Sequence, residues 1–488
     1  MEKVRTRFAP SPTGYMHIGN LRTALYAYLF AKSQHGDFIL RIEDTDRARY
    51  VADAVEFIKN TLAAAKIIPD EGPGFGGNFA PYIQSERMDI YNKYAEELVE
   101  SGHAYRCFCN HGEEKNSAPD DEKKFGGYNR HCRELSPEEI EKNLSEGKPY
   151  VIRQKMPLAG ETTFFDVLHG NITISTSELE DQILLKSDGM PTYNFANVVD
   201  DHLMEVTHII RGTEFITSTP KHVLLYEFFG WEIPKFIHLA PVMGKAEDGT
   251  VSKLSKRHGA TSFNDLIEAG YLPEAITNYV ALLGWNPKSN QEIFSMPELI
   301  EKFSLDGLSN SPSVFDYNKL GWMNGEYFKA MSDEDFAKSA EKFFCGLYEN
   351  SPEKKNYLAG ILKTRVSRFG EIPDMIKFLE TMPPLDVELF TNKRNKVTPE
   401  KSVAIIEPAI EIFSGIENWT PDELNEKISA FVEKTGLKIG TIMWPLRIAL
   451  SGQKVTPGGV TEILYLLGKE KSLERLNSGL NFLKNISD

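Results

Sequence analysis

The chain has 488 residues, 41% of them hydrophobic, and its 55 basic and 70 acidic side chains give a formal net charge of −15. A chain this long exceeds one hydrophobic core, so we expect about three to five domains. The acidic total excludes wholesale, charge-driven binding of nucleic acid, and such a partner must meet a local basic patch. No stretch approaches the ~20 apolar residues of a membrane helix. Four cysteines are too few for a disulfide framework, which favours a cytoplasmic location.

Residues 1–85 are expected to form the first half of an α/β domain. Residues 4–8 alternate like a short strand, and apolar residues between 21 and 29 recur at helical spacing. Between them lies FAPSPTGYMHIGN, a polar strand-to-helix turn of the kind that holds phosphates on the amides of a helix N-terminus. GPGFGG at 72–77 is similar to a nucleotide-binding motif, but no apolar strand precedes it, so we interpret it as a loop.

The composition changes along the rest of the chain. Residues 86–190 hold all but one of the cysteines beside a polar run, which predicts an inserted subdomain. Alternating and apolar segments at 191–244 predict that the α/β domain resumes there. Residues 245–325 carry a basic loop and then helical patterns, and residues 326–488 are helical almost throughout, with prolines between the helices. The last region is therefore expected to be a separate, all-helical domain.

Two short motifs have the residues needed to handle a nucleotide. In HIGN, the helix-start amides and His17 can hold a triphosphate, and Gly19 leaves room for a flat base. In VSKLSKRHGA, Lys253 and Lys256 form a compact cationic loop that can stabilise charge on a leaving pyrophosphate. Taken singly, a capped helix with an incidental histidine and a solvated basic turn explain these motifs equally well or better.

Together, in this order and at this separation, the two motifs resemble the signatures of class I aminoacyl-tRNA synthetases. Longer stretches are similar to the glutamyl-tRNA synthetase family, namely RFAPSPTG, RIEDTDRARY, APYIQSER, PTYNFANVVDDH, STPKHVLLYEFFGW, KLSKRHGA, SVFDYNKLGWMNGEY and WPLRIALSG. This resemblance spans essentially the whole chain. It implies an α/β fold: a Rossmann-like catalytic domain split by an inserted acceptor-end-binding subdomain, then a stem-contact region and an all-helical anticodon-binding domain.

The resemblance also implies a reaction in two steps. The α-carboxylate of L-glutamate would attack the α-phosphate of ATP bound with Mg²⁺, giving glutamyl-adenylate and pyrophosphate. The terminal adenosine 2′-hydroxyl of tRNA-Glu would then take the glutamyl group and release AMP. Catalysis would rest on positioning and electrostatic stabilisation. The family further implies that tRNA is required for activation and that the enzyme is a monomer, and it leaves open whether tRNA-Gln is also charged.

Matching positions assign the expected site residues. Asn20 stands where the full ATP signature has histidine, so that one contact is open. The catalytic groups would be His17, Lys253 and Lys256, and ATP would lie against Ser11, Thr13, His17, Gly19, Lys253 and Lys256. Glutamate would lie among Arg7, Ser11, Glu43, Tyr193, Asn197 and Arg211. A forked guanidinium at Arg211 suits the side-chain carboxylate, and Glu43 would accept from the α-ammonium.

Three cysteines and a tyrosine of the insertion form a further constellation. Clustered thiolates in a reduced compartment suggest a structural Zn²⁺ site. Resemblance to relatives with Cys-x-Cys followed by Tyr-x-x-x-Cys favours the ligands Cys107, Cys109, Tyr128 and Cys132. His131 is a possible substitute ligand, and Glu134 stands where many relatives have histidine. A metal-free, reduced loop is the alternative.

The helical region offers candidate tRNA contacts at Arg365, Arg368 and Arg447, although arginine on a helix is more often simply solvated. Cys345 lies on an apolar helical run and is expected to be a buried core thiol. Glutaminyl-tRNA synthetase is the nearest rival, but that family has FDDTN where this chain has RIEDTD, and β-barrels at its end. A glutamyl-transferring tRNA-modification enzyme lacks the helical region, and the intact motifs argue against a non-catalytic RNA-binding relative.

Overall fold

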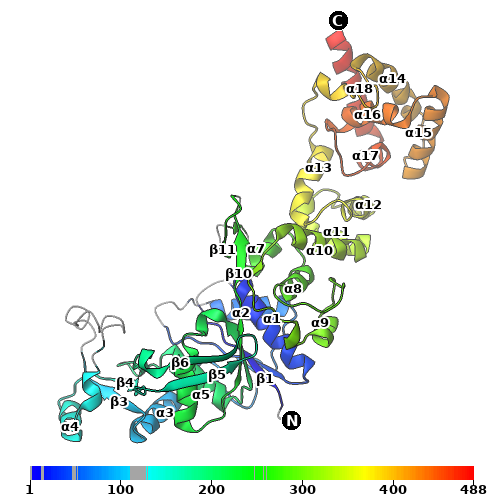
Figure 1. Cartoon of the computed structure of the whole chain (residues 1–488). Helices are drawn as coiled ribbons and strands as arrows, with labels where there is room; N and C mark the ends of the chain where they lie inside the picture. The colour runs from blue at the N-terminus through cyan, green and yellow to red at the C-terminus, as the bar shows by residue number, and fades with distance from the viewer. Residues whose placement is uncertain are drawn as a thin grey trace. The chain divides into compact units, whose positions relative to one another are not determined.

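A computed structural model describes residues 3–12, 16–46, 51, 53–109, 128, 130–246, 248–255, 258–259 and 261–487. The chain divides into two compact units, one of residues 1–267 with 273–320 and one of residues 268–272 with 321–488. The division lies close to residue 326, where the helical region is expected to begin. No helix in the described part of the chain is long and apolar enough to cross a membrane. Figure 1 shows both units.

A six-stranded sheet in the order β2-β1-β8-β9-β5-β6 is the centre of the first unit (Figure 1). Neighbouring strands are parallel except at the edge, where β5 and β6 are antiparallel. Parallel strands need helical crossovers, which cover both faces of the sheet. The strands are β1 (Arg5–Phe8), β2 (Asp37–Leu40), β5 (Glu161–Asp166), β6 (Gly170–Ser175), β8 (His208–Gly212) and β9 (Lys235–Leu239).

Helix α1 (Ile18–Ser33) is buried along most of its length because it has partners on two sides. It contacts β1, β2 and β8 on one side and α8 (Pro273–Ala281) and α9 (Met296–Lys302) on the other. The other helices of this unit outside the insertion are α2 (Ala54–Ala64), α5 (Tyr193–Leu203), α6 (Thr219–Phe229) and α7 (Phe263–Glu268). The strand and helix expected on either side of the opening turn are confirmed.

The insertion has its own antiparallel sheet, β3-β4-β7. Its elements are β3 (Ala104–Cys107), β4 (Val151–Gln154) and β7 (Ile183–Leu185), with α3 (Met88–Glu100) and α4 (Pro137–Ser145) beside them. Residues 161–175 differ from the expected boundaries, since they fall within the range 86–190 but form β5 and β6 of the large sheet. Alternating burial along β5 marks a half-exposed edge pair, and alternation does not reveal which sheet a strand joins.

A small sheet, β11-β10-β12, follows the last strand of the large sheet. Its strands are β10 (Val242–Lys245), β11 (Val251–Lys253) and β12 (Ser313–Val314), and β10 pairs antiparallel with β11. The hairpin places the first lysine of the KLSKR motif at the end of a strand. The glycine-rich segment at 72–77 is a loop, as expected: four of its glycines have positive φ, a conformation that favours glycine.

The second unit is a bundle of helices around one core. Prolines stand in the first turn of α12 to α15, where the missing N–H costs no hydrogen bond. Its helices are α10 (Tyr317–Ala330), α11 (Asp333–Ser339), α12 (Pro352–Leu362), α13 (Ile372–Glu380), α14 (Pro399–Ser414), α15 (Pro421–Thr435), α16 (Ile439–Ser451), α17 (Val460–Leu467) and α18 (Lys469–Ser487). The prediction of a helical C-terminal region is confirmed.

Cys345 corrects one expectation. Its thiol is exposed and not part of the core. The apolar run ends in the short 3-10 turn Glu341–Phe344, after which Cys345 adopts a φ of 53°. Phe344 therefore stays in the core while the chain turns outward at the cysteine.

Candidate active site

The HIGN turn presents a neutral hydrogen-bond donor at the start of α1. His17 is the N-cap residue, with extended backbone, and its Nδ1 accepts a hydrogen bond from the Gly19 amide at 3.2 Å. Because Nδ1 accepts, the proton of the neutral ring lies on Nε2. Burial and the charge of Lys253 lower the pKa of His17, which favours the neutral form. The imidazole N–H at the start of α1 can therefore donate to a phosphate.

Gly19 leaves open space beside this turn. A methyl group built at its Cα would contact only Nδ1 of His17, at 3.6 Å. A flat ring can therefore approach the backbone there, which a larger side chain at this position would prevent.

The structure brings the two sequence motifs together. The Ile18 amide donates to the Thr261 carbonyl at 3.0 Å, and His17 and Ser262 form an antiparallel bridge. Ser262 in turn accepts from the Asp265 amide at the start of α7. The segment that follows KLSKRHGA is thus fixed to the HIGN turn. Lys253 is exposed at the end of β11 and close enough for its charge to act on His17.

Three other residues are expected to contact ATP. Ser11 lies among the described residues, and its side chain is exposed. Thr13 and Lys256 lie outside the described residues.

One face of α5 points towards the large sheet. Tyr193, Asn197 and Asp201 recur every four residues, so they lie on the same side of the helix. Arg7 on β1 donates through Nε to both oxygens of Asp201, at 3.1 and 3.2 Å. Burial alone would raise the pKa of Asp201, but the charges of Arg41 and Arg7 outweigh it and lower that pKa. Asp201 is therefore an ionised, fully buried partner for these cations.

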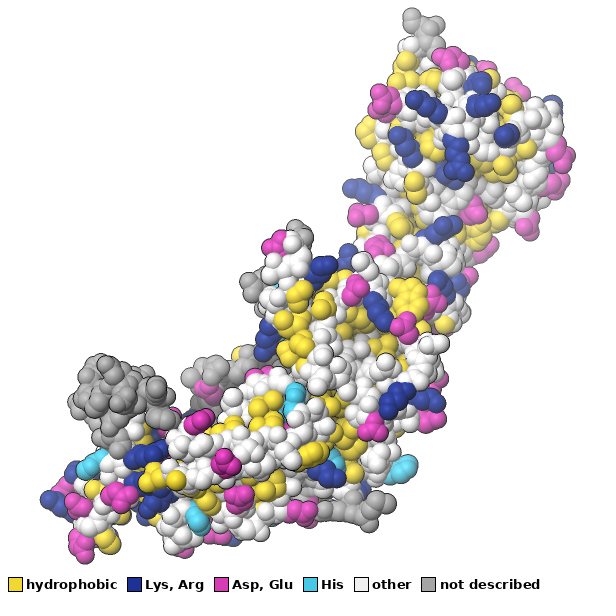
Figure 2. Space-filling view, viewed as in Figure 1, with side chains coloured by type: hydrophobic (Ala, Val, Ile, Leu, Met, Phe, Trp, Pro, Cys, Tyr) yellow, Lys and Arg dark blue, Asp and Glu magenta, His cyan; other side chains and the backbone are white. Residues whose placement is uncertain are grey.

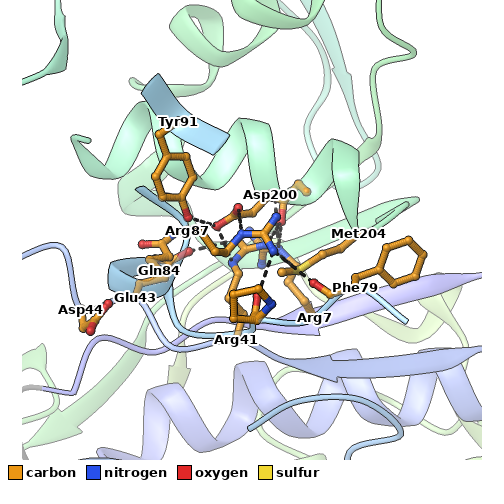
Figure 3. A network of polar contacts seen from close by, with 12 residues as sticks. Arg7, Arg41, Glu43, Asp44, Phe79, Gln84, Arg87, Tyr91, Asp200 and Met204 are labelled. Carbon is orange, nitrogen blue, oxygen red and sulfur yellow. Dashed lines mark hydrogen bonds and ion pairs between the residues drawn. The ribbon is translucent and has the colours of Figure 1, made fainter. Parts of the chain in front are cut away.

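Glu43 follows β2 and belongs to the same network (Figure 3). It accepts from Arg41 at 3.0 Å, and Arg41 also donates to Asp201 at 2.7 Å. Burial raises the pKa of Glu43, although the charges of Arg41 and Arg7 oppose this. Arg41 and Asp201 were not expected from the sequence. An arginine inside the apolar stretch FILRIE was the available signal, because a buried charge needs a paired one.

Asp200 anchors a second buried group, also missed by sequence reasoning (Figure 3). It accepts hydrogen bonds from Gln84 at 2.9 Å, Tyr91 at 2.8 Å and Arg87 at 2.8 Å. Asp44 accepts from the amide of Ser85 at 2.8 Å. The motifs RIEDTD, APYIQSER and VVDDH thus converge on one polar interior that fixes α3, α5 and the end of β2.

Arg211, on β8, is a buried guanidinium of a different kind. Only 4% of the residue is exposed, and no carboxylate of the described residues lies within ion-pair distance of it. Burial lowers the pKa of Arg211. Burial also raises the pKa of Tyr193, and the charges of Glu43, Arg211 and Arg7 act on that phenol, so these expected residues share one neighbourhood.

Asn197 completes this neighbourhood. It is 1% exposed, and its Nδ2 has no hydrogen-bond partner in the described part of the chain. A buried guanidinium lacking a carboxylate and a buried amide lacking an acceptor both suit an incoming carboxylate.

The insertion gathers three thiols. The sulfur atoms of Cys107, Cys109 and Cys132 all lie within 4.8 Å of one another. A hydrogen bond from Cys132 lowers the pKa of the Cys107 thiol, which favours the thiolate that metal ions bind. Tyr128 lies in the same buried cluster and accepts a hydrogen bond from Tyr105 at 3.0 Å. Three thiols at this spacing fit a tetrahedral metal site.

The possible substitute ligand His131 is exposed, whereas Tyr128 is buried. His131 and Glu134 are both exposed, at the two ends of a short 3-10 turn whose Cys132 is buried.

Of the expected tRNA contacts, Arg365 and Arg368 are exposed after α12, and Arg447 is half-buried on α16.

The parallel sheet, the HIGN turn and the helical unit agree with a class I tRNA synthetase, and family models show that class. Residues 3–322 match the family of tRNA synthetases class I (E and Q), catalytic domain, and residues 335–480 match an anticodon binding domain. The expected fold class is confirmed.

Similar sequences and solved structures show which family within this class the chain belongs to. The chain is 50% identical over 487 residues to a glutamate--tRNA ligase of Clostridium novyi (strain NT), covering 99% of both chains, and 49% identical over 486 residues to one of Clostridium acetobutylicum, also with 99% of both. A crystal structure of a glutamate tRNA ligase from Elizabethkingia meningosepticum matches with a TM-score of 0.87 and 38% identity, over 99% of this chain and 100% of that one. The chain belongs to the glutamate--tRNA ligase family, as its motifs indicated.

Proposed function

We propose that this protein attaches L-glutamate to the 3′ end of tRNA-Glu. ATP first activates the α-carboxylate as glutamyl-adenylate with release of pyrophosphate, and the tRNA 2′-hydroxyl then displaces AMP. The observation that carries this proposal is the junction of the HIGN turn with the segment after KLSKRHGA. Arg211, a buried guanidinium that lacks a carboxylate among the described residues, supports it. Neither step needs a covalent bond to a side chain, so positioning and charge stabilisation supply the rate.

His17, Gly19 and Lys253 would hold ATP. The Nε2 proton of His17 would donate to a phosphate oxygen, and adenine would lie over Gly19. Lys253 would neutralise charge that develops on pyrophosphate. By resemblance to the family we assign Lys256, Ser11 and Thr13 to the same nucleotide, and Mg²⁺ would accompany ATP.

Glutamate would lie above the buried network. Arg211 would bind its side-chain carboxylate through two N–H groups, with Tyr193 and Asn197 fixing the orientation. Glu43 would accept from the α-ammonium. Arg7 and Ser11 would complete the pocket.

Zn²⁺ would be structural, held by Cys107, Cys109, Cys132 and Tyr128. When bound, it supplies a cross-link between the end of β3 and the turn that carries Cys132. The three thiols and the phenol lie in one buried cluster, which supports this ligand set.

The helical unit would read the anticodon. On its face drawn in Figure 2, Lys and Arg side chains gather while acidic side chains lie towards the edges. Such a local patch can meet RNA despite the net charge of −15. Arg365, Arg368 and Arg447 stay predictions as contacts, as do a monomeric state, a cytoplasmic location and any charging of tRNA-Gln.

Aminoacylation with radiolabelled glutamate tests the proposal, using tRNA-Glu and tRNA-Gln transcripts separately. We expect tRNA-Glu to be charged, and ATP–pyrophosphate exchange to require tRNA. Charging of both transcripts would mean that another enzyme must amidate the tRNA-Gln product. If neither is charged with ATP and Mg²⁺ present, the proposed function is wrong.

A further inference from the structure

Arg211 is held entirely by uncharged acceptors. Its Nε donates to Nε2 of His238 at 3.1 Å, and one terminal nitrogen donates to the Thr219 hydroxyl at 2.7 Å. Both terminal nitrogens face Nδ1 of His222, at 3.3 and 3.4 Å. The two histidines and Thr219 are each at most 1% exposed, so water does not replace these bonds.

Asp166 fixes the tautomer of His238. Its Nδ1 lies 2.7 Å from Oδ2 of Asp166, whose other oxygen accepts from the amides of Leu168 at 2.9 Å and His169 at 3.0 Å. Burial would raise the pKa of Asp166, but hydrogen bonds, that of His238 foremost, outweigh it and lower that pKa. An ionised Asp166 can only accept, so the proton lies on Nδ1 of His238 and Nε2 accepts from Arg211.

His222 is fixed in the complementary way. Because Arg211 can only donate, Nδ1 of His222 must accept, and the ring proton lies on Nε2. That nitrogen is 2.9 Å from the side-chain oxygen of Asn194, in the first turn of α5. Burial lowers the pKa of His222 far below its usual value, and the charge of Arg211 adds to this. Both rings are therefore held as neutral acceptors.

The hydrogen-bond partners of Arg211 differ from those of the buried Arg7 and Arg41. Arg7 and Arg41 are paired directly with the carboxylate of Asp201. Behind His238, the carboxylate of Asp166 is separated from the Arg211 guanidinium by a whole imidazole ring. All three nitrogens of the guanidinium are thus hydrogen-bonded, yet its charge is not neutralised by a direct partner. A ligand carboxylate can supply the missing charge, whereas a neutral amide cannot.

We propose that the pairs Asp166–His238 and Asn194–His222 are positioning groups that hold Arg211 oriented and uncompensated, and thereby set selectivity for glutamate over glutamine. This inference rests on the proposed function, in which Arg211 binds the side-chain carboxylate. It assigns a role to four residues that do not themselves touch the substrate.

Two substitutions of His238 test the first pair. His238→Phe removes the acceptor but keeps a ring among Phe164 and Phe236, and it should raise the KM for glutamate about tenfold, since a charged donor is left buried without an acceptor. The KM for ATP should change less than twofold. His238→Gln, whose side-chain oxygen can accept from Arg211, should recover most of the loss. The matched control is His208→Phe, a buried histidine of β8 without a hydrogen bond to Arg211.

Inhibition by glutamine measures the selectivity for glutamate over glutamine. Glutamine should compete weakly with glutamate in the wild type, and the ratio of its Ki to the KM for glutamate should fall at least fivefold in His238→Phe. An unchanged KM and ratio in that variant, with wild-type activity on glutamate intact, would overturn the inference. A wild type that activates no glutamate would instead overturn the proposed function.

The second pair keeps the inference testable if His238→Phe does not fold. Asn194 is only half-buried, so Asn194→Ala should fold and should raise the KM for glutamate several-fold by releasing the tautomer of His222. Asn194→Asp keeps an acceptor and should stay within twofold of wild type. Equal effects of the two substitutions, or equal changes in the KM for glutamate and for ATP, would contradict a positioning role.

Discussion

Gly19 faces open space at the start of α1, where only Nδ1 of His17 would meet a new methyl group, at 3.6 Å. Gly19→Ala should therefore raise the KM for ATP about tenfold and leave that for glutamate unchanged, because the methyl group occupies the place of the adenine. The fold should not suffer, since alanine is a better helix former than glycine by about 1 kcal/mol. Exchange kinetics and thermal unfolding measure both effects.

Gly325→Ala is the matched control for this substitution. Gly325 lies within α10, and its added methyl group would come no nearer than 4.0 Å to Val366. An unchanged KM for ATP in Gly19→Ala would place the base elsewhere.

His208 gives a prediction for pH. Burial, with the charge of Lys235, lowers its pKa to about 4, against an ordinary value near 6.5. Below pH 6.5 the unfolded chain takes up this proton and the folded chain does not, so stability is lost as the pH falls towards 4. At pH 5 this single group should cost roughly 2 kcal/mol. His208→Phe should lose less stability than the wild type between pH 7.5 and pH 5, as measured by denaturant unfolding; identical losses would contradict the assignment.

At the scale of secondary-structure elements, hydrophobic periodicity predicted the strands and helices whose signal lies within one segment of the chain. The strand of residues 4–8 and the helix after Gly19 were found because their apolar spacing is local. The pairing of β5 with β9 was not found, because the same alternation fits either sheet. Arg41 and Asp201 were missed because each is a buried charge that is stabilised by the other, and the two residues lie far apart in the sequence.

The cysteine cluster joins two such segments, β3 and the turn with Cys132. We expect about one Zn²⁺ per chain by elemental analysis, and a loss of metal with Cys107→Ser, since a structural site needs its full ligand set. Tyr128→Phe should weaken zinc retention against a chelator if the phenol is the fourth ligand. Cys345→Ser is the control, because that thiol is exposed and outside the cluster. Absence of zinc from the wild type, purified with zinc supplied, would favour the metal-free loop.

At the scale of the whole molecule, the net charge of −15 opposes RNA, so affinity must come from a small number of local contacts. The logarithm of the KM for tRNA should rise linearly with the logarithm of salt concentration, by about 0.7 to 0.9 per phosphate neutralised. The KM for glutamate should change far less, because its pocket is buried and screened little.

Arg365→Ala should reduce that salt slope by about one if the exposed guanidinium meets a phosphate. Lys302→Ala is the control, since this exposed lysine ends α9 in the other unit. A slope that does not change in Arg365→Ala, together with an unchanged KM for tRNA, would remove Arg365 from the interface. A slope reduced equally by both substitutions would mean that general charge governs binding, which the acidic balance of the chain argues against.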